Sequence, residues 1–458
     1  MKEKKTAKYL IEEAPVAKTI AILVIPALLG SVVAQINFIL DTFFLSRVTY
    51  ENVDILLAAV AAAFPLSLII MAFANLFGIG GSIYGAKVLG QGDKVKARSV
   101  FSGTLVWGLI ANVGLIIVLL IILQPLLSML GATDPDTLKY AVDYAMPMIV
   151  GSFTVILTLI FVMFSRSEGK AMLVLITIVM QTLFNIILNY LFIIPMHMGT
   201  FGASLATVIS QGSQFLVIGI FLFSKKSEFQ FYARFKEKFN TKDLKEVLSL
   251  GVPATLGMVL LIVTSIILQI QAAAYNDISL VGAIGVLIKF FTMFTMLIQA
   301  AASGIQPVFA YAYGANNKQR FMVVYRAYFR VSLIVSGIVG ILLIMFPQVF
   351  SIFLALTSTT AQYVNVGTIG LGIMLVFMAA SFLLQVLYQS IGEAKKSMVI
   401  VLIRQLFVFL ILTIIFNKLF GAIGIIISQQ IAISLGAILT LIIYYPPLKA
   451  TIQQKFNN

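Results

Sequence analysis

Long apolar runs alternate with short clusters of charged residues along nearly the whole chain. A bilayer core about 30 Å thick requires about 20 consecutive apolar residues in a helix, so runs of this length predict membrane-spanning helices. Several runs are longer, which permits tilt or kinks without adding helices. The runs number about twelve and lie roughly at 16–46, 53–82, 99–123, 138–164, 171–195, 202–223, 245–274, 279–312, 327–346, 362–390, 397–417 and 421–445.

Composition agrees with an all-α polytopic membrane protein. Of the 458 residues, 60% are hydrophobic and 10% are charged, whereas ordinary soluble domains carry about 25% charged residues. The basic start MKEKKTAKYL resembles a signal peptide, but the apolar run from Val16 to Leu45 is far longer than a cleavable signal. We therefore predict a retained first helix. The absence of cysteine excludes disulfides, thiolate metal sites and cysteine nucleophiles.

Lysine and arginine gather in alternate loops, which tests the helix count independently. Cytoplasmic loops are enriched in these residues. The opposite set of loops holds Arg47, Lys139 and Lys418 beside several aspartates. The basic set comprises the N-terminus, the loops at 87–98, 166–170, 225–245, 318–330 and 395–396, and the C-terminus. Both termini are therefore predicted to be cytoplasmic, with the chain in the cell membrane.

The net charge of +14 follows from this loop distribution, so we expect membrane lipids and no nucleic acid as partners. We also expect a monomer without cofactors. The basic stretch 224–243 contains FQFYARFKEKF, in which phenylalanines alternate with charged residues. This pattern favours a short helix lying on the anionic leaflet.

The two halves of the chain repeat each other. Since six helices per half is an even number, both halves start from the same side, and the repeats are parallel. We therefore predict an N-terminal lobe at 1–223, a cytoplasmic linker at 224–243 and a C-terminal lobe at 244–458. The matching segments are IPALLG (25–30) with VPATLG (252–257), GIGGSIYGAKVLGQGDK (78–94) with AASGIQPVFAYAYGANNK (301–318), RSEGKAM (166–172) with QSIGEAK (389–395), and FGASLATVISQ (201–211) with FGAIGIIISQQ (420–430).

Pro26 and Pro253 occupy the same place in the two repeats. A proline inside a helix removes a backbone hydrogen bond and favours a bend. The pair is interpreted either as hinges for alternating access or as static kinks.

One carboxylate, Asp41, lies well inside a predicted span. Charged groups in hydrocarbon are costly, so such a residue indicates a functional site unless it faces water near the end of a long helix. Side chains three, four or seven residues apart share a helix face. The polar residues at such spacing are Asn37 in the first helix, Gln181, Asn185 and Asn189 in the fifth, and Ser204, Thr207, Gln211 and Gln214 in the sixth. Their oxygens suit H⁺ or Na⁺, although bonding between helices is the alternative.

The second half of the chain has different polar and charged residues inside its predicted spans. Its seventh and tenth helices contain glutamines, including Gln385, and no acidic residue, while Lys289 and Arg404 are its intramembrane charges. Each could pair structurally, extend toward the interface or face a substrate cavity. His197 is the only histidine and is interpreted as a loop residue. GIGGSIYG lacks the phosphate-loop pattern, and the sequence contains no nucleotide-binding domain. If the protein is a transporter, its energy must therefore come from an ion gradient or from the substrate's own gradient.

The sequence resembles the multidrug and toxic compound extrusion (MATE) family over essentially its whole length, and within it the prokaryotic DinF-like branch. The resemblance implies a V-shaped two-lobe transporter that exports amphipathic organic cations in exchange for H⁺ or Na⁺. The segments that carry the resemblance are IPALLG, YGAKVLGQGDKVKA, SEGKAM, NIILNYLFI and GASLATVISQ, together with the twelve-helix plan.

The resemblance also implies an ion-coupling site in the N-terminal lobe. Asp41, Asn185 and Thr207 match three of its residues, and Asn189 stands where that branch usually has aspartate. One carboxylate fewer favours H⁺ over Na⁺. The expected substrate cavity includes Asn37, Gln181, Gln211, Lys289 and Gln385.

Three alternatives remain. A lipid-linked oligosaccharide or other lipid flippase of the same superfamily would need several basic residues in its cleft, and only Lys289 and Arg404 are available. A membrane-embedded enzyme would need a catalytic constellation, which the sequence lacks. A channel is physically possible, but paired repeats with matched prolines favour alternating access.

Overall fold

The computed structural model describes residues 14–49, 51, 53–130, 132, 134–224, 227–353 and 358–457. The described chain consists of helices and their connections. It divides into two compact units, one up to Thr255 and one from Leu256 onward. The division falls inside helix α9 (Thr241–Ala273), so one continuous helix joins the units.

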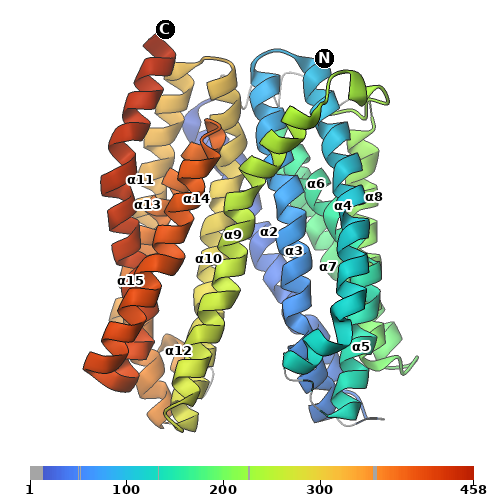
Figure 1. The fold of residues 1–458 in the computed structure, drawn as a ribbon, viewed down its shortest axis with the longest axis vertical. Helices are drawn as coiled ribbons and strands as arrows, with labels where there is room; N and C mark the ends of the chain where they lie inside the picture. The colour runs from blue at the N-terminus through green and yellow to red at the C-terminus, as the bar shows by residue number, and fades with distance from the viewer. Residues whose placement is uncertain are drawn as a thin grey trace. The chain divides into compact units, whose positions relative to one another are not determined.

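The first unit consists of helices that are mostly long enough to cross a bilayer (Figure 1). Helix α3 packs against α4, α5 and α6, and α7 packs against both α2 and α8. Helix α8 also packs against α5 and α6, so the contacts join all these helices into one bundle. Its helices before α9 are α2 (Val16–Leu45), α3 (Val53–Gly90), α4 (Lys94–Met129), α5 (Pro135–Val150), α6 (Ser152–Ser167), α7 (Ala171–Ile193), α8 (Gly199–Leu222) and the 3-10 turn η1 (Phe235–Glu237).

The span predicted at 138–164 is a bent pair of helices. Helices α5 and α6 meet at Gly151 at an angle of 47°. A Cβ atom at Gly151 would lie 2.4 Å from the Val208 side chain of α8. A glycine at the bend therefore lets α8 approach closely.

In the second unit, α13 packs against α10, α11 and α15 and forms the centre of the helix packing. Helix α15 contains a break at Gly421, where φ is 55° and ψ is −132°. This break divides the long segment into two spans. The helices after α9 are α10 (Ile278–Gly314), α11 (Lys318–Met345), α12 (Val349–Phe353), α13 (Ser358–Ser390), α14 (Ala394–Leu402), the π-helical turn η2 (Ile403–Phe407) and α15 (Val408–Asn457).

The prediction of twelve spans is confirmed in the described part of the chain. Ten helices there are long and apolar enough to cross a membrane, and the bent α5–α6 pair adds one more. The stretch Ala394–Lys455 is 62 residues long and is divided at Gly421, which gives the twelfth. The last helix continues to Asn457 instead of ending near 445.

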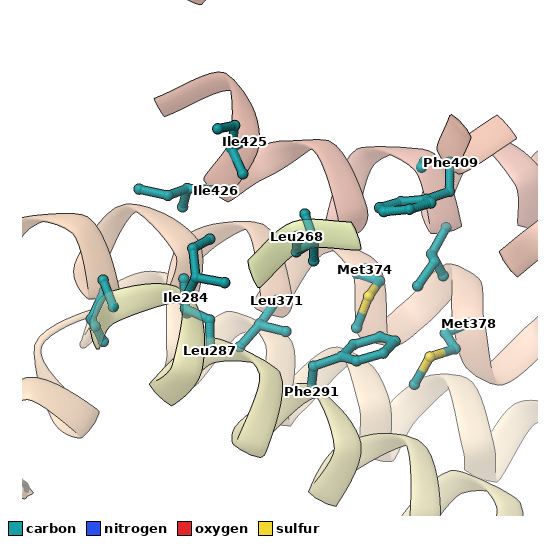
Figure 2. Packing of buried hydrophobic residues seen from close by; sticks show 14 of the residues in the cluster. Leu268, Ile284, Leu287, Phe291, Leu371, Met374, Met378, Phe409, Ile425 and Ile426 are labelled. Carbon is teal, nitrogen blue, oxygen red and sulfur yellow. The ribbon is translucent and has the colours of Figure 1, made fainter. Parts of the chain in front are cut away.

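An apolar cluster holds the second unit together. Figure 2 shows Leu268 of α9, Phe291 of α10 and Met374 of α13 converging with Phe409 and Ile426 of α15. All five side chains are buried. Burial of apolar side chains and close packing stabilise this helix contact.

The connection between α8 and α9, residues 223–240, is called the linker from here on; residues 225 and 226 lie outside the described part. The prediction of a short helix in this stretch is wrong for the described residues. The described linker contains a single 3-10 turn, and Phe229, Phe235 and Phe239 are buried. These rings belong to an apolar cluster of the first unit, where burial removes their surface from water.

Candidate functional site

Asp41 lies in α2 and is 7% exposed. Its two carboxylate oxygens accept hydrogen bonds from three different helices. Asn189 Nδ2 donates to Oδ1 at 2.8 Å, while Thr207 Oγ1 and Tyr144 OH donate to Oδ2 at 3.3 and 3.2 Å. A buried carboxylate is costly unless its oxygens are bonded, and these donors offset part of that cost.

The amides of α7 extend the network. Asn189 Nδ2 also donates to Asn185 Oδ1 at 3.1 Å, and Asn185 Nδ2 donates to Thr207 Oγ1 at 3.3 Å. The spacing of four residues places both amides on one helix face. Asp41, Asn185, Asn189 and Thr207 therefore form one connected cluster, as the sequence predicts.

Tyr144 is the member of the cluster that sequence reasoning missed. It lies in α5 and is 6% exposed, and its hydroxyl contacts Asp41 directly. The available signal is weak: Tyr140 and Tyr144 stand one turn apart in a largely apolar helix. Their direction depends on how α5 packs, which a periodicity cannot show.

The cluster offers oxygen ligands to a small cation. Asn189 Oδ1 is buried and has no hydrogen-bond partner among the described residues, and a buried acceptor of this kind is unfavourable until something donates to it or binds it. A carboxylate with amide and hydroxyl oxygens suits H⁺ or a hard cation such as Na⁺. The described residues contain no group of three or more His, Cys, Asp or Glu that could hold a metal.

The other polar residues of the first half have different surroundings. Gln181 is buried and donates to Ser210 Oγ at 3.4 Å, so it joins α7 to α8. The Oε1 atom of Gln211 is buried without a partner among the described residues. The side chain of Asn37 lies outside the described residues. His197 is exposed in the connection between α7 and α8.

In the second unit, Arg404 is 1% exposed and lies in the π-helical turn η2. Its guanidinium donates to Gln385 Oε1 at 2.9 Å and Ser381 Oγ at 3.3 Å and lies 3.9 Å from the centre of the Phe382 ring. Gln385 is thus an arginine partner. Lys289 is exposed on α10.

The repeat places apolar residues where the first unit has its carboxylate cluster. With Pro26 aligned to Pro253, Asp41 corresponds to Leu268 in α9. With FGASLATVISQ aligned to FGAIGIIISQQ, Thr207 corresponds to Ile426 in α15. Both residues belong to the apolar cluster of Figure 2. The polar cluster is therefore confined to one of the two repeats.

Comparison with known proteins agrees with this repeated architecture. The sequence profile of the MatE family matches residues 26–191 and 253–415, one segment in each repeat. The chain belongs to the MatE family. MatE proteins are membrane transporters, so the predictions of a two-lobe transporter fold and of a protein that is not an enzyme are confirmed. Membership of the DinF-like branch stays a prediction.

Several relatives and solved MatE structures are similar over nearly the full length. The chain is 26% identical to "Multidrug export protein MepA" of Staphylococcus haemolyticus and 27% identical to that of Staphylococcus aureus strain NCTC 8325, with 95% of both chains covered in each case. A crystal structure of "MATE in the bent conformation" has a TM-score of 0.90 at 24% identity, with 99% of each chain covered. An "outward-facing conformation of a multidrug resistance MATE family transporter" has a TM-score of 0.87 at 23% identity, again with 99% of each chain covered.

Proposed function

We propose that this MatE protein is a secondary active multidrug exporter of the cell membrane, and that it exchanges amphipathic organic cations for H⁺ or Na⁺ by alternating access. The observation that carries the proposal is the buried Asp41, whose oxygens accept bonds from α5, α7 and α8. A carboxyl group in a membrane interior is stabilised by taking up a proton or a cation. If the ion binds one conformation of the transporter more tightly than the other, its binding and release shift the balance between the two conformations, and this difference in affinity is the requirement for coupling.

The proposed direction of transport and the proposed class of cargo are inferred from the relatives, which are named multidrug export proteins. Pro26 and Pro253 are proposed as the hinges, and Gln181, Gln211, Lys289 and Gln385 as contributors to the cargo cavity. The charge pattern supports cytoplasmic termini.

We propose H⁺ as the preferred coupling ion. A site for Na⁺ is strengthened by each carboxylate that contacts the ion, and the described cluster contains one carboxylate, with amides at Asn185 and Asn189. A proton needs one acceptor oxygen, which Asp41 supplies by itself.

The test is ethidium efflux from proteoliposomes under an imposed pH gradient and, separately, an imposed Na⁺ gradient. Asp41→Asn keeps a hydrogen-bonding side chain of similar size but cannot bind or release a proton. We expect efflux to fall to the level of vesicles without a gradient, while the yield of folded protein stays unchanged. Asp136→Asn is the matched control, because Asp136 is an exposed carboxylate at the start of α5. Wild-type efflux in the Asp41→Asn protein would contradict the coupling role.

A further inference from the structure

A second buried carboxyl, Glu168, lies outside the predicted spans and outside the Asp41 cluster. It follows the last residue of α6, Ser167, and its side chain is 4% exposed. The hydroxyl of Ser227 and the backbone N–H of Phe229 both donate to its Oε1 atom, the latter at 2.9 Å. Both donors belong to the linker, so the linker closes over this carboxyl.

The surface beneath the linker is shaped to hold it. The ring of Phe229 is fully buried and lies 4.9 Å from that of Phe164 in an edge-to-face arrangement. A Cβ atom at Gly103 of α4 would lie 2.6 Å from the Phe239 ring. The backbone N–H of Tyr232 donates to Ser102 Oγ at 2.7 Å. The docked linker is therefore a specific packed contact.

The charged groups around Glu168 leave it without an ion pair among the described residues. Its linker neighbour Glu228 repels it electrostatically. Lys94 of α4 pairs with Glu228 at 3.1 Å, and Arg98 donates to the Glu228 carbonyl at 3.3 Å. Three further basic groups lie on neighbouring segments. Arg166 is in the last turn of α6. Lys170, in the connection after α6, has its Nζ 5.5 Å from the Phe221 ring centre, and Lys87 of α3 pairs with Glu246 at 3.8 Å.

The hydrogen-bond geometry leaves room for a proton. Both linker donors use Oε1, so a proton on Oε2 leaves both bonds in place. A neutral carboxyl also loses the cost of burying a charge under the linker. The closed arrangement thus suits the protonated form better than the charged form.

We propose that Glu168 is a second proton-binding site, on the cytoplasmic face, and that it takes up a proton when the linker docks on the first unit. Proton uptake and docking are then linked: each favours the other. The site needs neither the cargo nor the coupling ion of the proposed function, so its test can fail independently of that function.

The sign of the pH dependence follows from the burial. Burial beneath the linker raises the pKa of Glu168 from 4.5 to about 7, against the opposing hydrogen bonds of Ser227 and Phe229. A group that binds its proton more tightly in the docked state stabilises docking fully below its ordinary pKa, and this stabilisation is lost as pH rises toward the docked pKa. Docking should therefore weaken about tenfold between pH 6 and pH 8 and change little above that. Acidification of the cytoplasm tightens the linker.

The experiment uses the full chain in detergent or proteoliposomes and exploits the absence of cysteine. Ser102→Cys places a thiol of nearly the same size beneath the linker, and Ala233→Cys places one on its exposed side. The rate of modification by a water-soluble maleimide at position 102, divided by the rate at position 233, removes the pH dependence of the reagent. We expect this ratio to rise about tenfold from pH 6 to pH 8.

Glu168→Gln keeps an acceptor oxygen for Ser227 and Phe229 but cannot titrate. In this background we expect the labelling ratio to stay low and independent of pH. Hydrogen exchange of the linker amides in the unmodified chain, corrected for intrinsic rates, gives a second readout without the reporter cysteine. A ratio independent of pH with Glu168 present, no labelling of position 102 at any pH, or unchanged pH dependence in Glu168→Gln would each overturn the proposal.

Discussion

Asn189 is the residue that sets the chemistry of the Asp41 cluster. Its amide nitrogen donates to Asp41 and Asn185, while its carbonyl oxygen is buried without a partner among the described residues. An aspartate at this position would replace the donor by an acceptor and place two carboxylates within hydrogen-bond distance. Two such groups cannot both be charged unless a proton or cation lies between them.

Asn189→Asp should therefore raise the contribution of Na⁺ to coupling. We expect ethidium efflux driven by an imposed Na⁺ gradient to increase several-fold over that of the unsubstituted protein, because the second carboxylate adds negative charge to the oxygen cage. The measurement compares efflux under Na⁺ and pH gradients of equal magnitude.

Ser204→Ala is the control for this substitution. Ser204 lies on α8 with Thr207, but its hydroxyl donates to the Phe201 carbonyl of its own helix at 3.1 Å. The ion preference of the Ser204→Ala protein should equal that of the unsubstituted protein. If Asn189→Asp also leaves the ion preference unchanged, the idea that the number of carboxylates decides the ion is wrong.

At the scale of single residues, the sequence predicts those members of the cluster that share a helix face or match the family's residues. Asp41, Asn185, Asn189 and Thr207 are found by polarity, spacing and family resemblance, and the structure brings them within hydrogen-bond distance of one another. Tyr144 could not be predicted, because its direction depends on how α5 packs against its neighbouring helices. Likewise, the bond from Arg404 to Gln385 depends on the packing of η2 against α13.

At the scale of elements, α3 and the start of α9 approach each other closely at two glycines. A Cβ atom at Gly80 would lie 2.0 Å from the Val247 carbonyl oxygen, and one at Gly251 would lie 2.0 Å from that of Leu76. Small residues at a membrane helix interface allow dispersion contacts between backbones. These two glycines therefore let the helices touch along their lengths.

Gly80→Ala and Gly251→Ala should each force α3 and α9 apart. Overpacking of this kind costs about 1–3 kcal/mol, so we expect a lower thermal unfolding midpoint in detergent. Gly114→Ala is the matched control, since no atom lies within 4 Å of a Cβ placed there on α4. Equal midpoints for Gly80→Ala and Gly114→Ala would show that this contact can relax at no cost.

Apolar run length predicts where spans lie but not how they are interrupted. The bend at Gly151 and the left-handed backbone at Gly421 are single-residue events inside apolar sequence. The π-helical turn at 403–407 likewise leaves no mark in composition. At Gly151 the neighbouring helix contributes, since a Cβ atom there would lie 2.4 Å from the Val208 side chain of α8.

At the scale of the whole molecule, the distribution of charge predicts a single orientation in the membrane. Asp136, at the start of α5, and Ala233, in the linker, are exposed residues predicted to lie on opposite sides of the membrane. In intact cells, a membrane-impermeant maleimide should label Asp136→Cys and leave Ala233→Cys unmodified until the membrane is opened. The reverse pattern would place the linker and both termini outside the cell.

The repeats have diverged in chemistry while keeping their helical plan. The first contains the Asp41 cluster, and the second has Leu268 and Ile426 at the corresponding positions. Alignment of the two repeats in sequence predicts this difference. The aligned segments need no gaps, so Asp41 pairs directly with Leu268 and Thr207 with Ile426. Under the proposed function, this difference favours one ion-coupling site per molecule rather than two.

The division between the units at Thr255, within α9, has a mechanical consequence. The linker is held on the first unit, so the chain passes from one unit to the other as a rod and not as a slack tether. A rod transmits torque, whereas a flexible tether absorbs it. Any reorientation of one unit against the other must therefore bend or rotate α9, and the division lies two residues beyond Pro253. A rotation of α9 in one unit would thus be transmitted along the helix to the other unit.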